Sequence, residues 1–240
     1  MENIALSSSG RVAAFFDLDC TLVSCNTGRL FLNDLRARGE ISLVKALRAL
    51  SWLAKYKLAM LDLTTITAHV ADFLRGKHEQ DFAEQCQRLV EDQVLPRLLP
   101  AGLRTVEQHR GRGHLLALLS SSPRYIVGPV ARALSIEAVG ATEFEVEKGR
   151  LTGRLQGPAC FGAGKIHWAE ALSKTHQLNV QLSWFYTDSY TDLPMLERVD
   201  NRVVVNPDPR LKRAARTRGW QVQDWMSSQA AGWQPEASTT

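Results

Sequence analysis

Residues 12–21 read Val-Ala-Ala-Phe-Phe-Asp-Leu-Asp-Cys-Thr, an apolar run that ends in two carboxylates and a hydroxyl. Residues 12–16 show no alternation of polar and apolar side chains, which is typical of a strand buried on both faces of a parallel sheet. Asp17 and Asp19 follow the carboxyl end of that strand, where open α/β sheets bind their ligands. The stretch therefore predicts a strand that delivers acids to a site. A solvated turn is the alternative, because Asp is common in turns.

The composition is that of an ordinary globular chain. Its 240 residues are 45% hydrophobic and 22% charged, which suits one large α/β domain or a core with a smaller second domain. The net charge of +4 and the pI near 9.0 fit anionic ligands such as phosphates, and also weak non-specific binding to nucleic acid. The four cysteines form no Cys-x-x-Cys pair, which indicates reduced thiols in a cytoplasmic protein. The sequence indicates neither a signal peptide nor a transmembrane span.

Residues 27–94 read as a helical insert with few turn signals. Within it, residues 41–58 place their cations on one side of a helical wheel and their leucines on the other, so an amphipathic helix with a basic face is predicted. The plain interpretation is a solvated face on a packed helix. A surface that lies on anionic lipid and a basic lip that guides a phosphorylated substrate are the alternatives.

A strand, a polar turn and a helix are predicted next. Residues 114–119 are a short apolar run, residues 120–123 read Ser-Ser-Ser-Pro, and a helix is expected over residues 124–134. Ser122 as N-cap and Pro123 as the first helical residue would have structural roles. Ser120 is left over at the end of the strand, where its hydroxyl and the following backbone N–H groups, beginning with that of Ser121, are placed to hold a phosphate.

A hairpin is predicted over residues 143–155, and a Gly-Ala-Gly-Lys sequence at residues 162–165 opens the next helix. A lysine in the first turn of a helix opposes the helix dipole, so Lys165 is a candidate ligand for an anion. A surface lysine without a function is the alternative. The segment is not a Walker A loop, because Ala159 and Ile166 occupy the places of the first Gly and of the Ser/Thr.

Acids again follow an apolar strand at residues 182–187, where the sequence continues with Asp188 and Asp192. Asp192 has a structural alternative as a helix start, because Pro194 stands in the first turn. Asp188 precedes that position and has no such role. A last strand is expected over residues 202–205, and residues 227–240 should form a flexible tail.

Four groups thus stand in order along the chain: Asp17, Asp19 and Thr21, then Ser120, then Lys165, then Asp188 and Asp192. Their order and spacing resemble the haloacid dehalogenase superfamily of phosphohydrolases, whose motifs are an Asp-x-Asp-x-Thr loop, a Ser/Thr, a Lys and a closing acidic pair. The resemblance covers about residues 11–210. It implies an α/β fold with a Rossmann-like, doubly wound, mostly parallel sheet and an inserted helical cap of the C1 type.

The resemblance also implies a domain organisation. The catalytic core would comprise residues 1–26 and 95–226, the cap residues 27–94, and the tail residues 227–240. The Val-Asn-Pro-Asp sequence at residues 205–208 resembles the phosphoserine phosphatase branch, subfamily IB. One departure is that Thr187 stands where Gly usually precedes the acidic pair. This departure predicts an altered loop geometry rather than a lost metal.

The resemblance implies a Mg²⁺-dependent phosphatase. Attack by a carboxylate on an anionic ester needs a cation to screen the repulsion, and an oxygen-rich pocket selects Mg²⁺. By resemblance, Asp17 attacks phosphorus and becomes an aspartyl phosphate, while Asp19 protonates the leaving alcohol and later deprotonates water. The implied metal ligands are Asp17, the backbone carbonyl of Asp19, Asp188 and, through water, Asp192. The implied phosphate ligands are Thr21, Ser120, Ser121 and Lys165.

The substrate is predicted from Asn26. In phosphoserine phosphatases a Glu nine residues after the nucleophile meets the substrate's amino group, and here that position is Asn26. A neutral amide lacks the charge that strengthens such a hydrogen bond, so histidinol phosphate or a phosphorylated polar head group is expected rather than phosphoserine. A phosphoserine phosphatase is the alternative. Trp52, Tyr56 and Phe73 either line a larger pocket or, as the plainer interpretation, pack in the core.

Two hypotheses that assign the chain to other classes of protein remain. A phospho-accepting receiver module also uses acids, a hydroxyl and a lysine around Mg²⁺, but a shorter chain without a cap would be expected, with its acceptor on an internal strand. A non-catalytic basic module for anionic lipid or nucleic acid is the second. The partners predicted for the phosphatase are a small phosphorylated substrate, no specific nucleic acid, and at most a weak contact with a membrane surface.

Overall fold

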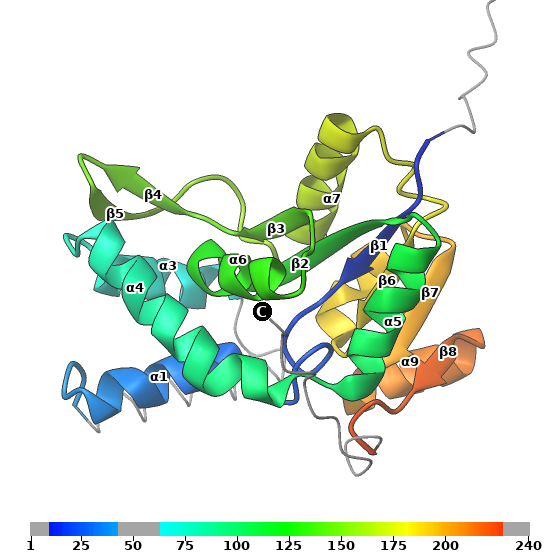
Figure 1. The fold of residues 1–240 in the computed structure, drawn as a ribbon, viewed down its shortest axis with the longest axis horizontal. Helices are drawn as coiled ribbons and strands as arrows, with labels where there is room; N and C mark the ends of the chain where they lie inside the picture. The colour runs from blue at the N-terminus through cyan, green and yellow to red at the C-terminus, as the bar shows by residue number, and fades with distance from the viewer. Residues whose placement is uncertain (1–9, 43–62, 228–240) are drawn as a thin grey trace, which may run out of the picture.

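The computed structural model of the chain describes residues 10–42 and 63–227. Its centre is a six-stranded sheet with the strand order β3-β2-β1-β6-β7-β8 (Figure 1). All of the neighbouring strands in this sheet are parallel. The predicted α/β fold with a Rossmann-like parallel sheet is therefore confirmed. The strands are β1 (Ala13–Phe16), β2 (Leu115–Pro123), β3 (Ala138–Thr142), β6 (Trp184–Thr187), β7 (Asn201–Val205) and β8 (Gln221–Gln223).

Strand β1 lies in the middle of the sheet, between β2 and β6, and all four of its side chains are completely buried. Ala14 and Phe16 join the core on one face of the sheet, and Ala13 and Phe15 join the core on the other. A strand in this position needs apolar side chains on both faces, which explains its unbroken apolar sequence. From β1 the chain continues to β2 and β3 on one side of the sheet, and β6, β7 and β8 lie on the other side. A ligand crevice is expected at this change of direction, where the carboxyl ends of β1 and β6 meet.

Helices cover both faces of the sheet (Figure 1). Apolar side chains of α5 (Pro100–Gly111) and α6 (Arg124–Ala133) belong to the core on one face. Side chains of α7 (Ala163–His176), α8 (Leu193–Leu196) and α9 (Pro209–Arg218) belong to the core on the other. Trp225, which follows β8, is 3% exposed and packs on the first face.

The described part of the insert is helical. It comprises α1 (Thr27–Ala37), α3 (Leu63–Phe73) and α4 (Glu79–Leu89), and it returns to the sheet through a π-helical turn at Val90–Val94 and a 3₁₀ turn at Leu95–Arg97. The basic helix predicted at residues 41–58 lies almost entirely outside the described residues, as do Trp52, Tyr56 and residues 228–240 of the tail. Phe73 is described and is 39% exposed. Within residues 10–42 and 63–227 no helix is long and apolar enough to cross a membrane.

The predicted hairpin forms from β4 (Phe144–Glu147) and β5 (Arg150–Leu155). Its turn contains Lys148 and Gly149, with φ angles of 50° and 74°, and this left-handed geometry is usual for two-residue hairpin turns. The hairpin extends away from the sheet and lies beside α3 and α4 (Figure 1). The backbone N–H of Gly76 donates to the carbonyl of Leu151 at 2.8 Å, and the backbone N–H of Leu151 donates to the carbonyl of Lys77 at 3.0 Å.

The predicted N-cap role of Ser122 is wrong. Strand β2 continues through Ser122 to Pro123 because its last residues pair with β3, so Pro123 itself precedes α6 and no side chain caps that helix. The hydroxyl of Ser122 instead lies 2.6 Å from the hydroxyl of Thr27 in α1. The serine therefore serves a contact between the sheet and the insert rather than its own helix.

Candidate active site

The predicted acids and hydroxyls gather at the carboxyl edge of the sheet because their strands are parallel and in register. Phe16 pairs with Leu118 of β2 and with Tyr186 of β6, so the residues just beyond these positions are neighbours in space. The backbone N–H of Asp17 donates to the carbonyl of Tyr186 at 2.9 Å. This bond fixes the start of the acidic loop against β6.

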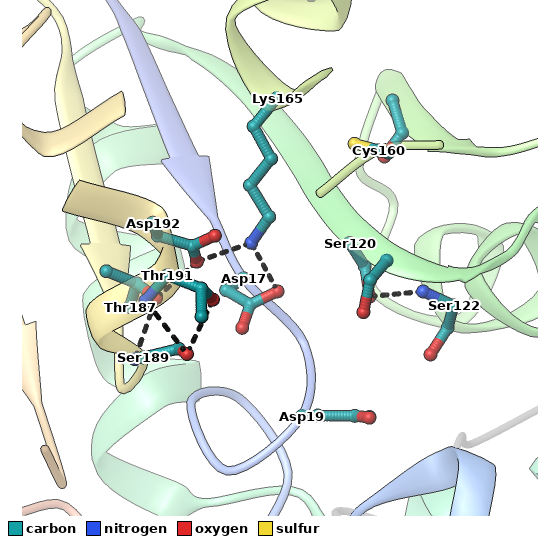
Figure 2. A network of polar contacts seen from close by, with 12 residues as sticks. Asp17, Asp19, Ser120, Ser122, Cys160, Lys165, Thr187, Ser189, Thr191 and Asp192 are labelled. Atoms are coloured by element: carbon teal, nitrogen blue, oxygen red, sulfur yellow. Dashed lines mark hydrogen bonds and ion pairs between the residues drawn. The ribbon is translucent and has the colours of Figure 1, made fainter. Parts of the chain in front are cut away.

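Lys165 lies between two acids. It is the third residue of α7, and its Nζ lies 2.9 Å from Asp17 Oδ1 and 2.6 Å from Asp192 Oδ2 (Figure 2). The side chains of Lys165 and Asp192 are each 2% exposed. Burial acts to lower the pKa of Lys165, but the Asp17 and Asp192 carboxylates outweigh burial and hold that pKa above its ordinary value. The lysine therefore stays charged inside the protein.

The same surroundings affect the acids. Burial raises the pKa of Asp17 to about 6, with Lys165 opposing this change and Asp192 adding to it. Burial and the charges of Asp17 and Asp192 raise the pKa of Asp188 well above its ordinary value. Asp17 and Asp192 contact the ammonium, and Asp188 interacts with all three of these groups through its charge, so the four groups carry a net charge of −2 when all are ionised. The site is thus short of positive charge.

Thr187 is part of this cluster. It is completely buried, its hydroxyl donates to Asp192 Oδ2 at 2.6 Å, and it accepts the N–H of Ser189 at 3.2 Å (Figure 2). Asp192 precedes α8 as expected for a helix start, but its carboxylate makes no capping hydrogen bond. The carboxylate is instead held by Lys165 and Thr187. A glycine at position 187 would lack the second of these bonds.

Asp19 has different neighbours from Asp17. Its Oδ1 accepts the backbone N–H of Thr27 at 3.1 Å, and its Oδ2 accepts the Thr27 hydroxyl and the Asn26 side-chain N–H, both at 3.2 Å. Asp19 lies apart from Lys165, Asp17 and Asp192, and nearer the N-terminus of α1 (Figure 2). Burial, and then the charge of Asp17, raise the pKa of Asp19 to about 7, while the bonds from Thr27 oppose this change. Near neutral pH the protonated and ionised forms of this carboxyl are therefore both populated.

Asn26 caps α1 with its side chain. Its Oδ1 accepts the backbone N–H of Arg29 at 2.9 Å while its Nδ2 donates to Asp19. One acceptor site and one donor of the amide are therefore already used within the protein. This geometry could not be inferred from the spacing between Asn26 and Asp17 alone.

The predicted phosphate ligands differ in their hydrogen bonding. Thr21 is completely buried, and its hydroxyl has no partner within the described part of the chain, a costly state that a bound acceptor would relieve. Ser120 is 1% exposed, and its hydroxyl oxygen accepts the N–H of Ser122 at 3.2 Å. The carbonyl of Ser121 accepts the Thr142 hydroxyl at 2.8 Å. The hydroxyl hydrogen of Ser120 remains available for another acceptor.

Two residues of this region were not singled out from the sequence as site residues. Thr27 was only the first residue of a predicted helix, and Ser122 was assigned to a cap. Both are buried, and their hydroxyls contact each other beside Asp19. The only sequence signal for Thr27 is its position directly after Asn26, because nothing local links it to a serine that lies 95 residues away.

Residues 14–197 match the model of the haloacid dehalogenase-like hydrolases. The chain is 29% identical to phosphoserine phosphatase SerB1 of Mycobacterium tuberculosis, covering 91% of this chain and 72% of the relative. It is 28% identical to a histidinol-phosphatase of Neisseria meningitidis, covering 87% of this chain and 96% of the relative. A protein of unknown function from Bordetella pertussis has a similar structure, with a TM-score of 0.82, 28% identity, and coverage of 91% of this chain and 100% of that chain. The predicted family and the prediction of an enzyme are confirmed, and the chain belongs to the haloacid dehalogenase-like hydrolases.

Proposed function

We propose that this enzyme is a Mg²⁺-dependent phosphomonoester hydrolase that forms an aspartyl phosphate on Asp17. One observation carries the proposal: a buried ammonium, that of Lys165, contacts Asp17 and Asp192 at the carboxyl edge of a parallel sheet. A buried lysine in this position neutralises an acid before the substrate arrives, and it can hold a phosphoryl oxygen when the substrate is bound. The curated relatives named as phosphatases support the same chemistry.

The residues fit a magnesium ion. Three carboxylates face one lysine, and the carboxylate of Asp188 has no hydrogen-bond or ion-pair partner within residues 10–42 and 63–227. In those residues no three His, Cys, Asp or Glu side chains are grouped as metal ligands. The proposed set needs only the Asp17 and Asp188 carboxylates and the Asp19 carbonyl, with Asp192 acting through water, and such all-oxygen sets suit Mg²⁺. When bound, the ion would screen the charge of the phosphoryl group.

The protein groups would then share the reaction as follows. The Asp17 carboxylate forms a bond to phosphorus while the bond from phosphorus to the leaving oxygen breaks, and Asp19 gives its proton to that oxygen. Water, deprotonated by Asp19, next attacks the aspartyl phosphate and releases inorganic phosphate. A pKa raised to about 7 suits a group that must both donate and accept a proton. The unpartnered Thr21 hydroxyl, Ser120, the Ser121 backbone and Lys165 hold the phosphoryl oxygens.

We propose a small phosphorylated metabolite other than phosphoserine as the substrate, with histidinol phosphate or a phosphorylated head group favoured. The amide of Asn26 has no charge to match an ammonium, and its side chain already bonds to Arg29 and Asp19. The segment at residues 27–94 acts in this proposal as a cap that excludes water. All four cysteines are free thiols, which supports a cytoplasmic location.

Hydrolysis of p-nitrophenyl phosphate with and without Mg²⁺ tests the reaction. We expect turnover that requires Mg²⁺ and falls by orders of magnitude in Asp17→Asn, an isosteric change that leaves the sheet folded. Near wild-type turnover by Asp17→Asn would exclude the covalent mechanism. No turnover by the wild type would contradict the proposed phosphatase reaction.

A panel of phosphate esters tests the substrate. We expect phosphoserine to be hydrolysed no better than histidinol phosphate or glycerol phosphate. A kcat/KM for phosphoserine that exceeds that of every other ester by about tenfold or more would overturn the argument from Asn26 and favour the phosphoserine phosphatase alternative.

A further inference from the structure

The acid that would protonate the leaving group is held mainly by a residue of the insert. Thr27, the first residue of α1, gives the Asp19 carboxyl two of the three hydrogen bonds that it receives from described residues, one from the backbone N–H at 3.1 Å and one from the hydroxyl at 3.2 Å. These bonds reach both oxygens of the carboxyl, so they fix its rotation as well as its position. The N-terminus of a helix also favours a negative charge at this point.

The Thr27 hydroxyl has a second contact, on the sheet. Its oxygen lies 2.6 Å from the hydroxyl oxygen of Ser122 in β2. A hydroxyl carries one hydrogen, so when Thr27 donates to an ionised Asp19 it must accept from Ser122. The backbone N–H of Ser122 donates in turn to the hydroxyl oxygen of Ser120, at 3.2 Å. Ser120 is therefore connected to Asp19 through two groups of Ser122, its backbone N–H and its hydroxyl, and through the hydroxyl of Thr27.

The residues that make this connection are well protected. Thr27 is completely buried, Ser122 is 7% exposed and Ser120 is 1% exposed, so water does not readily replace a lost hydroxyl. The bond between Ser122 and Thr27 and the bond between Thr27 and Asp19 share the Thr27 hydroxyl, so each of these two bonds strengthens the other. Removal of the Thr27 hydroxyl would leave Asp19 with Asn26 and one backbone N–H, and would leave Ser122 without its side-chain partner.

We propose that Thr27 is the positioning residue for Asp19, and that its hydroxyl links the acid to the end of β2, where Ser120 and Ser121 would bind the phosphoryl group. The inference rests on the proposed function, because it gives Asp19 its role as an acid. Thr27 does not touch the reacting atoms. It acts by holding the Asp19 carboxyl in one orientation while the phosphoryl group is held by the neighbouring strand.

The test compares the leaving groups of two similar esters. Phenolate is a far poorer leaving group than p-nitrophenolate, so phenyl phosphate depends more on a proton from Asp19. In Thr27→Val, which keeps the shape and removes the hydroxyl, we expect kcat/KM to fall about tenfold or more for phenyl phosphate and less than about threefold for p-nitrophenyl phosphate. Thr27→Ser keeps the hydroxyl and should hold both values within about threefold of the wild type.

The controls separate a positioning role from a structural one. Thr105→Val removes a hydroxyl whose one bond to a described residue goes to the carbonyl of Ala101 within α5, and it should change the hydrolysis of neither ester. Ser122→Ala removes the hydroxyl that contacts the Thr27 hydroxyl. It should lower the kcat/KM for phenyl phosphate more than that for p-nitrophenyl phosphate. This variant tests the proposal even if Thr27→Val folds poorly. Equal losses for both esters in Thr27→Val and Ser122→Ala would overturn the proposal. A wild type inactive on both esters would overturn the proposed function, and this inference with it.

Discussion

Gly164→Ala tests whether the loop before α7 sets the position of Lys165. A Cβ at Gly164 would lie well inside van der Waals contact of the Ala159 carbonyl oxygen and 3.2 Å from its carbonyl carbon. That oxygen accepts the backbone N–H of Phe161 at 2.8 Å. The backbone N–H of Cys160, the residue between them, donates to the hydroxyl of Thr142 at 3.1 Å. The loop is therefore held from two sides and cannot simply move away.

The magnitude follows from these contacts. Relief of the clash needs a displacement of roughly 1 Å, and overpacking of this kind costs about 1–3 kcal/mol. The higher helix propensity of alanine returns only about 0.5–1 kcal/mol, so the net loss lies between about 0 and 2.5 kcal/mol, and we expect a value near the middle of this range. Lys165 is the next residue, and its contacts with Asp17 and Asp192 are 2.9 and 2.6 Å. A misplacement near 1 Å at such a site lowers turnover about 100-fold.

Urea unfolding and turnover of p-nitrophenyl phosphate measure the two effects. Gly111→Ala is the matched control, because the site is the last residue of α5 and the new Cβ would meet no atom within 4 Å beyond its chain neighbours and its own helix backbone. That change should stabilise the protein by about 0.5–1 kcal/mol and leave turnover unchanged. If Gly164→Ala keeps its free energy of unfolding within about 0.5 kcal/mol and its turnover within a factor of about two, the argument from the loop is refuted.

Two further predictions concern Thr187 and His109. Thr187→Val removes the 2.6 Å bond to Asp192, so we expect about tenfold lower turnover and a higher Mg²⁺ requirement; unchanged Mg²⁺ titrations would show that Lys165 alone orients Asp192. Burial, then His114 and Arg112, lower the pKa of His109 to about 4. The unfolded state therefore binds more protons below pH 6.5, and the stability contributed by the neutral ring is full above pH 6.5 and is lost as the pH falls towards 4. The loss is at most about 3 kcal/mol, and urea unfolding of His109→Gln should show a correspondingly smaller loss of stability between pH 7 and 5. Parallel pH profiles for the two proteins would contradict this expectation.

The local parts of the fold could be predicted because short stretches of sequence determine them. An uninterrupted apolar run indicated β1 as a central strand, and Lys148-Gly149 marked the hairpin turn. The end of β2 could not be predicted in this way. Its Ser-Ser-Ser-Pro sequence has the composition of a turn, and only the pairing with Ala141 and Thr142 of β3 keeps it extended.

The predicted site also divides into features that local sequence determines and features that depend on contacts between distant residues. Asp17 and Lys165 were identified from their positions after a strand and at a helix start, and they do contact each other. The role of Ser122 could not be predicted, because a serine before a helix has the same local sequence whether its hydroxyl bonds to its own helix or to another one. Its partner, Thr27, is distant in sequence, and no local pattern encodes such a contact.

The hairpin that lies beside the insert has a consequence for how the enzyme would admit its substrate. Backbone hydrogen bonds join residues 76–79 to Gly149 and Leu151, and His78 forms a β-bridge with Arg150. Helices α3 and α4 therefore cannot swing away from the sheet as a free lid. Opening must either break these bonds or carry β4 and β5 along, which would add the two connections of the hairpin, before Phe144 and after Leu155, to the hinges at the two ends of the insert.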